Sequence, residues 1–257
     1  MDEATALLET ITRTPPHAPT ACDGWRCHEL VAHLAAGAAE MATHTERALT
    51  GAPPLATTDH ARREAPFVAM ADDELRTRLV SEALRLQAAV DAVRRTGAPV
   101  HFAGRAMAPD EITLHGRSEA ALHRWDLAGD DDTGDDLLSQ PELTEHAVTV
   151  LNSMVSGSPE STASRVPPMG PVRWPFPLTV ASPGRPDVAL VFDTTGPRLE
   201  LAEPCRHPVA VADPAARLLA LWGRRSERAV TWTTDGDGAE LLARFLWGRS
   251  DRVVAAH

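Results

Sequence analysis

Lysine and tyrosine are both absent from this chain of 257 residues, so all 25 basic residues are arginine. Aromatic residues make up only 4% of the sequence, and an excess of acidic residues gives a formal net charge of −11. A protein that binds a nucleic-acid duplex needs basic surface to displace counterions from the phosphates. An anionic membrane surface also attracts basic segments. The charge balance therefore argues against nucleic acid and against membranes as partners.

The sequence also lacks the segments that direct a chain into or across a membrane. No apolar run reaches the roughly 18–20 residues that a spanning helix needs, and the N-terminus has neither the basic start nor the apolar core of a signal peptide. The three cysteines, Cys22, Cys27 and Cys205, cannot all pair within the chain. Cys22 and Cys27 also lack the further closely spaced ligands of a zinc knuckle. We therefore expect a cytoplasmic protein with reduced thiols.

The first part of the chain shows helical periodicity. Apolar residues recur at helical spacing, and proline and glycine interrupt the chain between the helical segments. Four sizeable helices joined by short links predict a helix bundle that spans residues 1–157. In that bundle we expect residues 99–104 to be an irregular crossover and the acidic residues 130–136 to be a solvated loop. The predicted sizeable helices cover residues 25–49, 72–95, 109–127 and 140–155, and a short helix covers residues 4–13.

The composition and the periodicity of the sequence change after the last of these helices. Residues 156–171 are rich in serine, proline and glycine, which is typical of a linker. Short β-like runs then alternate with two helical segments, a pattern that predicts a separate small α+β domain at residues 170–257. The expected strands are residues 176–180, 188–192, 199–201, 209–211 and 229–232, and the expected helices are residues 215–222 and 239–247.

One stretch, EITLHGRSEAALHRWD at residues 111–126, carries residues with metal-binding chemistry. Glu119 and His123 lie four residues apart, so a helix places both side chains on one face, one turn apart. A carboxylate oxygen and an imidazole nitrogen that face the same way form half of a divalent metal site. His115, four residues before Glu119, lies on the same stripe. We expect His33, from the apolar side of the earlier helix, to complete the site.

Each part of this pattern is weak alone. Most Glu-x-x-x-His pairs on helices are surface hydrogen bonds, and a single histidine on an apolar helix face is usually a core residue. The combination is stronger, because Glu119 lies among apolar neighbours such as Leu122 and Trp125. A buried carboxylate without a partner is costly, and a cation would neutralise it and bind the imidazole as well.

Two pairs of motifs resemble a known family. WRCHELVAHLAAG, followed well downstream by SEAALHRWDLAG, resembles the metal-binding motifs of the mycothiol-dependent maleylpyruvate isomerase family, within the DinB-like bundle superfamily. RLLALWGRR, followed by DGDGAELLARFLWG, is similar to the small sterol-carrier-like domain attached to that family's bundle. The resemblance covers essentially the whole chain. It implies a DinB-like four-helix bundle followed by a small α+β (sterol-carrier-like) C-terminal domain.

The resemblance also implies roles for individual residues. His33, Glu119 and His123 match the family's three metal ligands, which leave positions open for water or substrate. Zinc is the expected ion, although this ligand set also suits other divalent metals. Arg224 matches a catalytic arginine of the C-terminal domain, where a guanidinium grips a carboxylate with two prongs; Arg225 is a possible substitute.

Two further residues near this motif have open roles. His115 matches no metal ligand of the family, and it is either a general base or an exposed histidine. Asp126 either supports the metal ligand His123 from behind or makes an ordinary hydrogen bond near the helix end.

The expected activity follows from the family. A divalent metal would bind mycothiol, a small thiol cosubstrate, as its thiolate. The thiolate would add to the double bond of an electrophilic, acidic cis-enedioate, the resulting single bond would rotate, and the thiol would be expelled to leave the trans isomer. Two alternatives stay open. One is a mycothiol S-transferase that acts in conjugation, detoxification or biosynthetic sulfur incorporation, and the other is a non-catalytic, metal-binding regulatory module.

Overall fold

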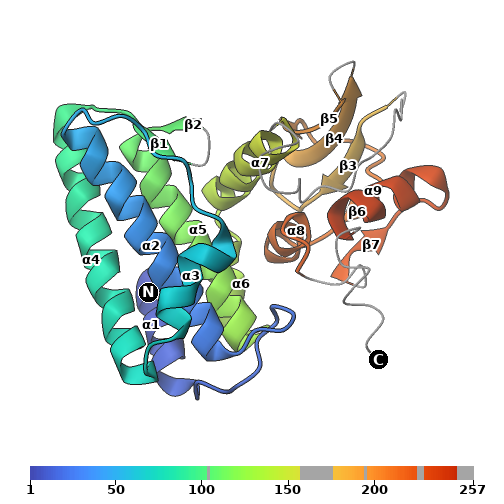
Figure 1. Cartoon of the computed structure of the whole chain (residues 1–257). Helices are drawn as coiled ribbons and strands as arrows, with labels where there is room; N and C mark the ends of the chain where they lie inside the picture. Colours follow the sequence, from blue (N-terminus) through green and yellow to red (C-terminus); the bar gives the residue numbers. More distant parts are fainter. Residues whose placement is uncertain (103–104, 157–175, 194–195, 225–228, 248–257) are drawn as a thin grey trace. The chain divides into compact units, whose positions relative to one another are not determined.

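The computed structural model describes residues 1–102, 105–156, 176–193, 196–224 and 229–247. The chain divides into two compact units, Met1–Gly129 and Asp130–His257, and each is described here by itself (Figure 1). Apart from its first residue, the expected linker at residues 156–171 lies outside the described residues. Within the described part of the chain, no helix is long and apolar enough to cross a membrane.

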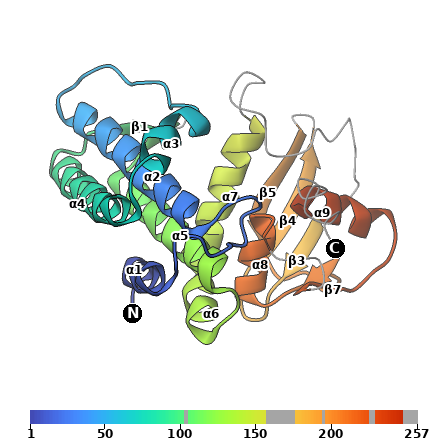
Figure 2. The same ribbon diagram turned by 60° about the horizontal axis from the view of Figure 1, so that its bottom comes forward.

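The first unit is built mainly from long helices. Helix α2 packs along α4, α1 packs along α5, and the short helix α3 lies on α2 (Figures 1 and 2). A small antiparallel pair of strands, β1 and β2, precedes α5. The elements are α1 (Glu3–Arg13), α2 (Cys27–Leu49), α3 (His60–Val68), α4 (Asp72–Thr96), β1 (Val100–Phe102), β2 (Arg105–Met107) and α5 (Pro109–Ala128).

The ends of the two helices that flank the hairpin follow from local sequence. Helix α4 begins with three acidic residues and ends with two arginines, which complements the helix dipole. Gly97 then stops it with φ at 70°, a left-handed conformation that favours glycine. Pro109 opens α5, and the backbone N–H of Ala108 donates to Glu111 Oε2 at 2.7 Å. The sequence predicts these helices to within about two residues.

Two buried clusters hold α2 against its neighbours. One lies near the start of α2 and includes Ile11, Val31 and Leu75. The other lies further along α2 and includes Met41 and Ile112. Burying a side chain of this size contributes on the order of 1.5–3 kcal/mol. The two clusters therefore fix the register between α2 and α5, the two helices that carry the predicted metal ligands.

Three short segments differ from the sequence prediction. The crossover expected at residues 99–104 contains strand β1, and no helix was predicted where α3 forms. The acidic loop expected at residues 130–136 instead contains helix α6 (Asp132–Leu138). Aspartate caps explain both helices: the side chain of Asp59 accepts from the N–H of Arg62, and that of Asp131 accepts from the N–H of Gly134. Acidic residues in a helix's first turn are also favoured by its dipole.

The second unit is a mixed sheet with helices. Its strand order is β5-β4-β3-β6-β7; β3 and β6 are parallel, and the other neighbours are antiparallel. Helix α8 begins with a cap from Asp213 and is almost entirely buried. Besides α6, the elements are α7 (Pro141–Ser156), β3 (Leu178–Ala181), β4 (Asp187–Asp193), β5 (Gly196–Ala202), β6 (Ala210–Val211), α8 (Pro214–Leu221), β7 (Thr231–Trp232) and α9 (Asp237–Trp247).

Helix α7 belongs to this second unit, whereas we expected it to close the N-terminal bundle. It packs against β5 and α8, as Figure 2 shows for β5. The Asn152 amide donates to the carbonyl of Leu199 at 2.7 Å and accepts from its N–H at 2.8 Å. Both backbone groups of Leu199, on the edge strand β5, therefore have hydrogen-bond partners. Apolar periodicity shows that a helix has one buried face, but it does not show which surface covers that face. The units therefore divide after Gly129, not near the expected residue 157.

Candidate metal centre

The structure brings the three expected metal ligands together within the first unit. Helix α2 supplies His33, and α5 supplies Glu119 and His123 one turn apart. Glu119 Oε2 lies 3.7 Å from His33 Nε2 and 3.5 Å from His123 Nε2. One ligand atom from each residue lies within 4.8 Å of the other two. This spacing suits three ligands of a single cation, since ligands at about 2.0–2.2 Å from zinc are themselves separated by several ångströms.

Both imidazoles are fixed from behind by a carboxylate. His33 Nδ1 lies 2.7 Å from Glu64 Oε1, and His123 Nδ1 lies 2.8 Å from Asp126 Oδ2. A carboxylate accepts hydrogen bonds, so each Nδ1 carries the proton and each Nε2 keeps a lone pair. A carboxylate behind a histidine in this way is the usual support of a histidine metal ligand. Asp126 therefore has the supporting position that we considered for it.

Two further groups of potential ligands share these histidines. One contains His33, His60 and Glu64, and the other contains Cys22, His123 and Asp126. In the first group Nδ1 of His33, and in the second Nδ1 of His123, already donates a short hydrogen bond to the carboxylate. In the group with Glu119, both Nε2 atoms lie within 3.7 Å of the carboxylate and the Nδ1 hydrogen bonds are kept, so this group fits a divalent cation best.

Electrostatics keep the carboxylates of the centre ionised. Burial acts to raise the pKa of Glu119, but hydrogen bonds that the His123 and His33 rings donate in their doubly protonated form, and the nearby His115, hold that pKa well below its usual value. The pKa of Glu64 is likewise lowered: burial opposes ionisation, but hydrogen bonds from His33 and His60 outweigh it. The Glu119 carboxyl is therefore charged at neutral pH.

Helix α3 contributes residues that the sequence analysis missed. His60 stacks on the ring of His33, with centroids 5.8 Å apart, and Glu64 is one turn further along. Arg63 bridges the Glu40 and Glu64 carboxylates, with N–O distances of 3.2 and 3.0 Å. A signal was present, because His60 and Glu64 have the same four-residue spacing as the pair on α5. A proline in this short helix obscured it.

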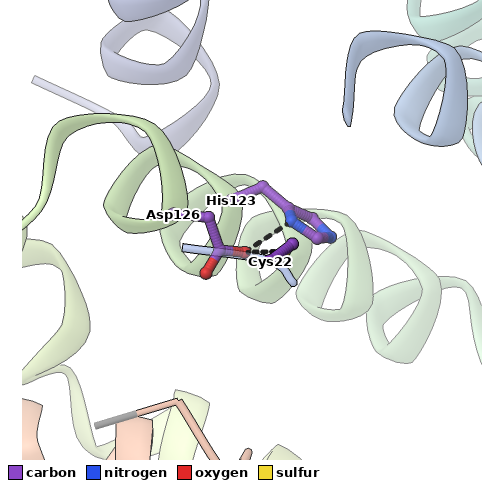
Figure 3. A group of neighbouring side chains, drawn as sticks. All are labelled: Cys22, His123 and Asp126. Carbon is purple, nitrogen blue, oxygen red and sulfur yellow. Dashed lines mark hydrogen bonds and ion pairs between the residues drawn. The ribbon is translucent and has the colours of Figure 1, made fainter. Parts of the chain in front are cut away.

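Cys22, which we expected to be an ordinary thiol, lies beside the centre. Figure 3 shows that the Asp126 carboxylate contacts both Cys22 and His123. Cys22 Sγ is 3.2 Å from Asp126 Oδ2, the same oxygen that accepts from His123. Nothing in the sequence pointed to this contact, which joins residues 104 positions apart. Cys27 is different: it belongs to the core, and burial raises the pKa of its thiol despite the nearby Arg76.

The two predicted catalytic residues lie in different units. His115 is half-buried on α5, one turn before Glu119, with its ring 6.4 Å from that of Phe102. Arg224 lies in the second unit, shortly after α8; it is half-buried, and its N–H donates to the carbonyl of Leu219 at 2.9 Å. Arg225, the possible substitute, lies outside the described residues.

Comparison with known proteins agrees with this geometry. Residues 1–128 match the model of the mycothiol maleylpyruvate isomerase N-terminal domain family. The chain belongs to this family through those residues. The match ends one residue before the boundary of the first unit, so all residues of the candidate centre lie in the family's domain.

Solved structures extend the likeness to the rest of the chain. Two crystal structures of the mycothiol-dependent maleylpyruvate isomerase, one of them with a histidine-to-alanine substitution, match with a TM-score of 0.59. Each is 18% identical in sequence, and each match covers 91% of this chain and 90% of the other. At this identity the match shows a shared fold. The search among curated proteins found no match.

Proposed function

We propose that this chain is a metal-dependent and mycothiol-dependent enzyme of the maleylpyruvate isomerase type. One observation carries the proposal: two imidazoles, each held by a carboxylate at Nδ1, direct Nε2 toward the charged Glu119. An arrangement of this kind inside a family named for a thiol-dependent isomerase supports thiol chemistry at a metal. The proposed substrate is an electrophilic, acidic cis-alkene.

A divalent cation fits this donor set, with His33, Glu119 and His123 as its ligands. Two nitrogens and one carboxylate oxygen suit zinc, and three protein ligands leave room for an exchangeable fourth. When bound, such a cation lowers the pKa of a coordinating thiol, so that the thiolate nucleophile is available at neutral pH. Glu64 and Asp126 keep the two imidazoles in the tautomer that binds the cation.

The remaining roles fall to two residues outside the ligand set. We assign His115 as a general base, since it is half-buried and lies one helical turn before Glu119 on α5. We assign Arg224 to the substrate's carboxylate, because a guanidinium matches a carboxylate with two parallel hydrogen bonds. The helices of the first unit and the mixed sheet of the second also support the DinB-like four-helix bundle and the sterol-carrier-like domain as parts of this proposal.

Metal analysis of the purified protein tests the proposal first. We expect about one zinc ion per chain in the wild-type protein, and loss of zinc in His33→Ala and in His123→Ala. His17→Ala is the matched control, since His17 is an exposed histidine of the same unit and its loss should leave the zinc content unchanged. A wild-type protein that takes up no divalent cation would overturn the proposal.

Turnover then separates the isomerase from the transferase. With mycothiol and maleylpyruvate, an isomerase converts cis substrate to trans product while the concentration of free thiol stays constant. Stoichiometric loss of free thiol during turnover would instead show an S-transferase. We also expect Arg224→Ala to raise KM for the acidic substrate with little change in the zinc content of the protein.

A further inference from the structure

The loop before α2 lies beside the candidate metal centre. Trp25 places its ring 5.0 Å from the His33 ring. Cys22 contacts the carboxylate that supports His123. A single short loop therefore contacts one of the two histidines directly and the other through its supporting carboxylate.

This loop is a closed and anchored structure. The N–H of Thr20 donates to the carbonyl of Trp25 at 3.2 Å, and the N–H of Trp25 donates to the carbonyl of Cys22 at 3.0 Å. The N–H of Ala21 donates to the backbone carbonyl of Asp126 at 2.8 Å. The position of Cys22 relative to the end of α5 is thus set by backbone hydrogen bonds.

The Asp126 carboxylate contacts two side chains through a single oxygen. Its side chain has no solvent exposure, so bulk water cannot solvate it. Its Oδ2 lies between His123 Nδ1 at 2.8 Å and Cys22 Sγ at 3.2 Å. Since a carboxylate only accepts hydrogen bonds, the Cys22 thiol is the donor. The thiol therefore restrains the rotation of the carboxylate, and the carboxylate restrains the His123 ring.

We propose that Cys22 is a positioning residue for the metal centre and acts on the metal ligand His123 through Asp126. The proposal rests on the function proposed above, because positioning matters only if His123 binds a cation. It assigns Cys22 a hydrogen bond that orients the Asp126 carboxylate and, through it, the His123 ring, so this thiol acts without binding the cation and without reacting. Serine, which also donates, should replace it better than alanine.

Zinc affinity, measured by competition with a chromophoric chelator, tests the proposal. We expect Cys22→Ala to weaken zinc binding about threefold to tenfold, at or below the low end of the effect of removing a direct supporting residue. Cys22→Ser should stay within about twofold of wild type, because it keeps an O–H donor. Cys205→Ala is the matched control: Cys205 is an exposed cysteine of the second unit, and its loss should have no effect.

The nitrogen NMR signals of the His123 ring in the metal-free protein give an independent reading. We expect Cys22→Ala to reduce the population of the Nδ1–H tautomer, and Cys22→Ser to preserve it. A merely structural role would lower Tm without changing the tautomer or the zinc affinity, and that result would overturn the proposal. If Cys22→Ala does not fold, Cys22→Ser still tests the proposal. A Cys22→Ser variant that is as stable as wild type but has lost the Nδ1–H tautomer of His123 would also contradict the proposal.

The two proposals fail separately. A wild-type protein without zinc would reject the proposed function, whereas the tautomer of His123 can still be compared among the metal-free variants. Normal zinc binding by wild type and by Cys22→Ala, with an unchanged tautomer, would reject only the role of Cys22.

Discussion

The hydrogen bonds that hold the two histidines of the centre have similar lengths, but their carboxylates come from different elements. Asp126 supports His123 from the same helix, three residues further on, and is 2% exposed. Glu64 supports His33 from α3, 31 residues away in sequence. Helix α3 has nine residues and none of them is fully buried. A hydrogen-bond distance alone therefore does not show how firmly a ligand is held, because the stability of the supporting element differs.

The largest expected difference between the two sides is in local opening. Amides in α3 should exchange with solvent about a hundredfold or more faster than those in the middle of α5, because opening α3 exposes little apolar surface. Hydrogen exchange followed by mass spectrometry of the metal-free protein measures this directly. Equal protection of the two helices would mean that Glu64 is held as firmly as Asp126.

Removing the buried support should have the next largest effect. We expect Asp126→Asn to weaken zinc binding about 10–100-fold, because the amide lacks the charge that keeps the proton on Nδ1 of His123. Chelator competition gives the affinity. Asp110→Asn is the control on the same helix, since the Asp110 side chain is 89% exposed; an equal loss in both variants would contradict the assignment.

The support from α3 should matter less. We expect Glu64→Gln to weaken zinc binding only about threefold to tenfold, because the Glu64 side chain is 13% exposed and water can take over part of its hydrogen bond. Glu74→Gln, at an exposed position on α4, should leave the affinity unchanged. A loss larger than that of Asp126→Asn would reverse the comparison between the two sides.

The smallest effect concerns acid stability. The pKa of Glu64 is lower in the folded protein than the ordinary value of 4.5, so the unfolded chain takes up the proton first as pH falls. The stabilisation by the ionised Glu64 carboxylate is thus complete at pH values above the ordinary pKa of a glutamate carboxyl, and it is lost progressively as the pH falls below that value. Chemical denaturation of the metal-free protein at about pH 5.5 and about pH 3.5 should show a smaller loss of stability for Glu64→Gln than for wild type. An identical loss would show that Glu64 is not ionised preferentially in the folded state.

The sequence predicted three residues of the centre from patterns within single helices. Glu119 and His123 share a helix face, and His33 lies on an apolar stripe, so helical periodicity and a family motif were enough to select all three. The structure places them as that pattern requires. Their binding of a metal stays a prediction until it is measured.

The supporting residues could not be predicted in this way. The contact of Glu64 with His33 depends on how α3 folds back onto α2, and that of Cys22 with Asp126 depends on the path of an irregular loop. Neither follows from periodicity. The assignment of α7 to the first unit was wrong for the same reason: an amphipathic pattern defines an apolar face but not its partner.

The carboxylates behind the two imidazoles also have a kinetic consequence. Because folding already orients both imidazole rings, the conformational entropy of ordering them is lost before any ion arrives. An incoming cation should then meet a rigid receptor on the α5 side, and its capture should be limited by diffusion and by loss of its own water molecules.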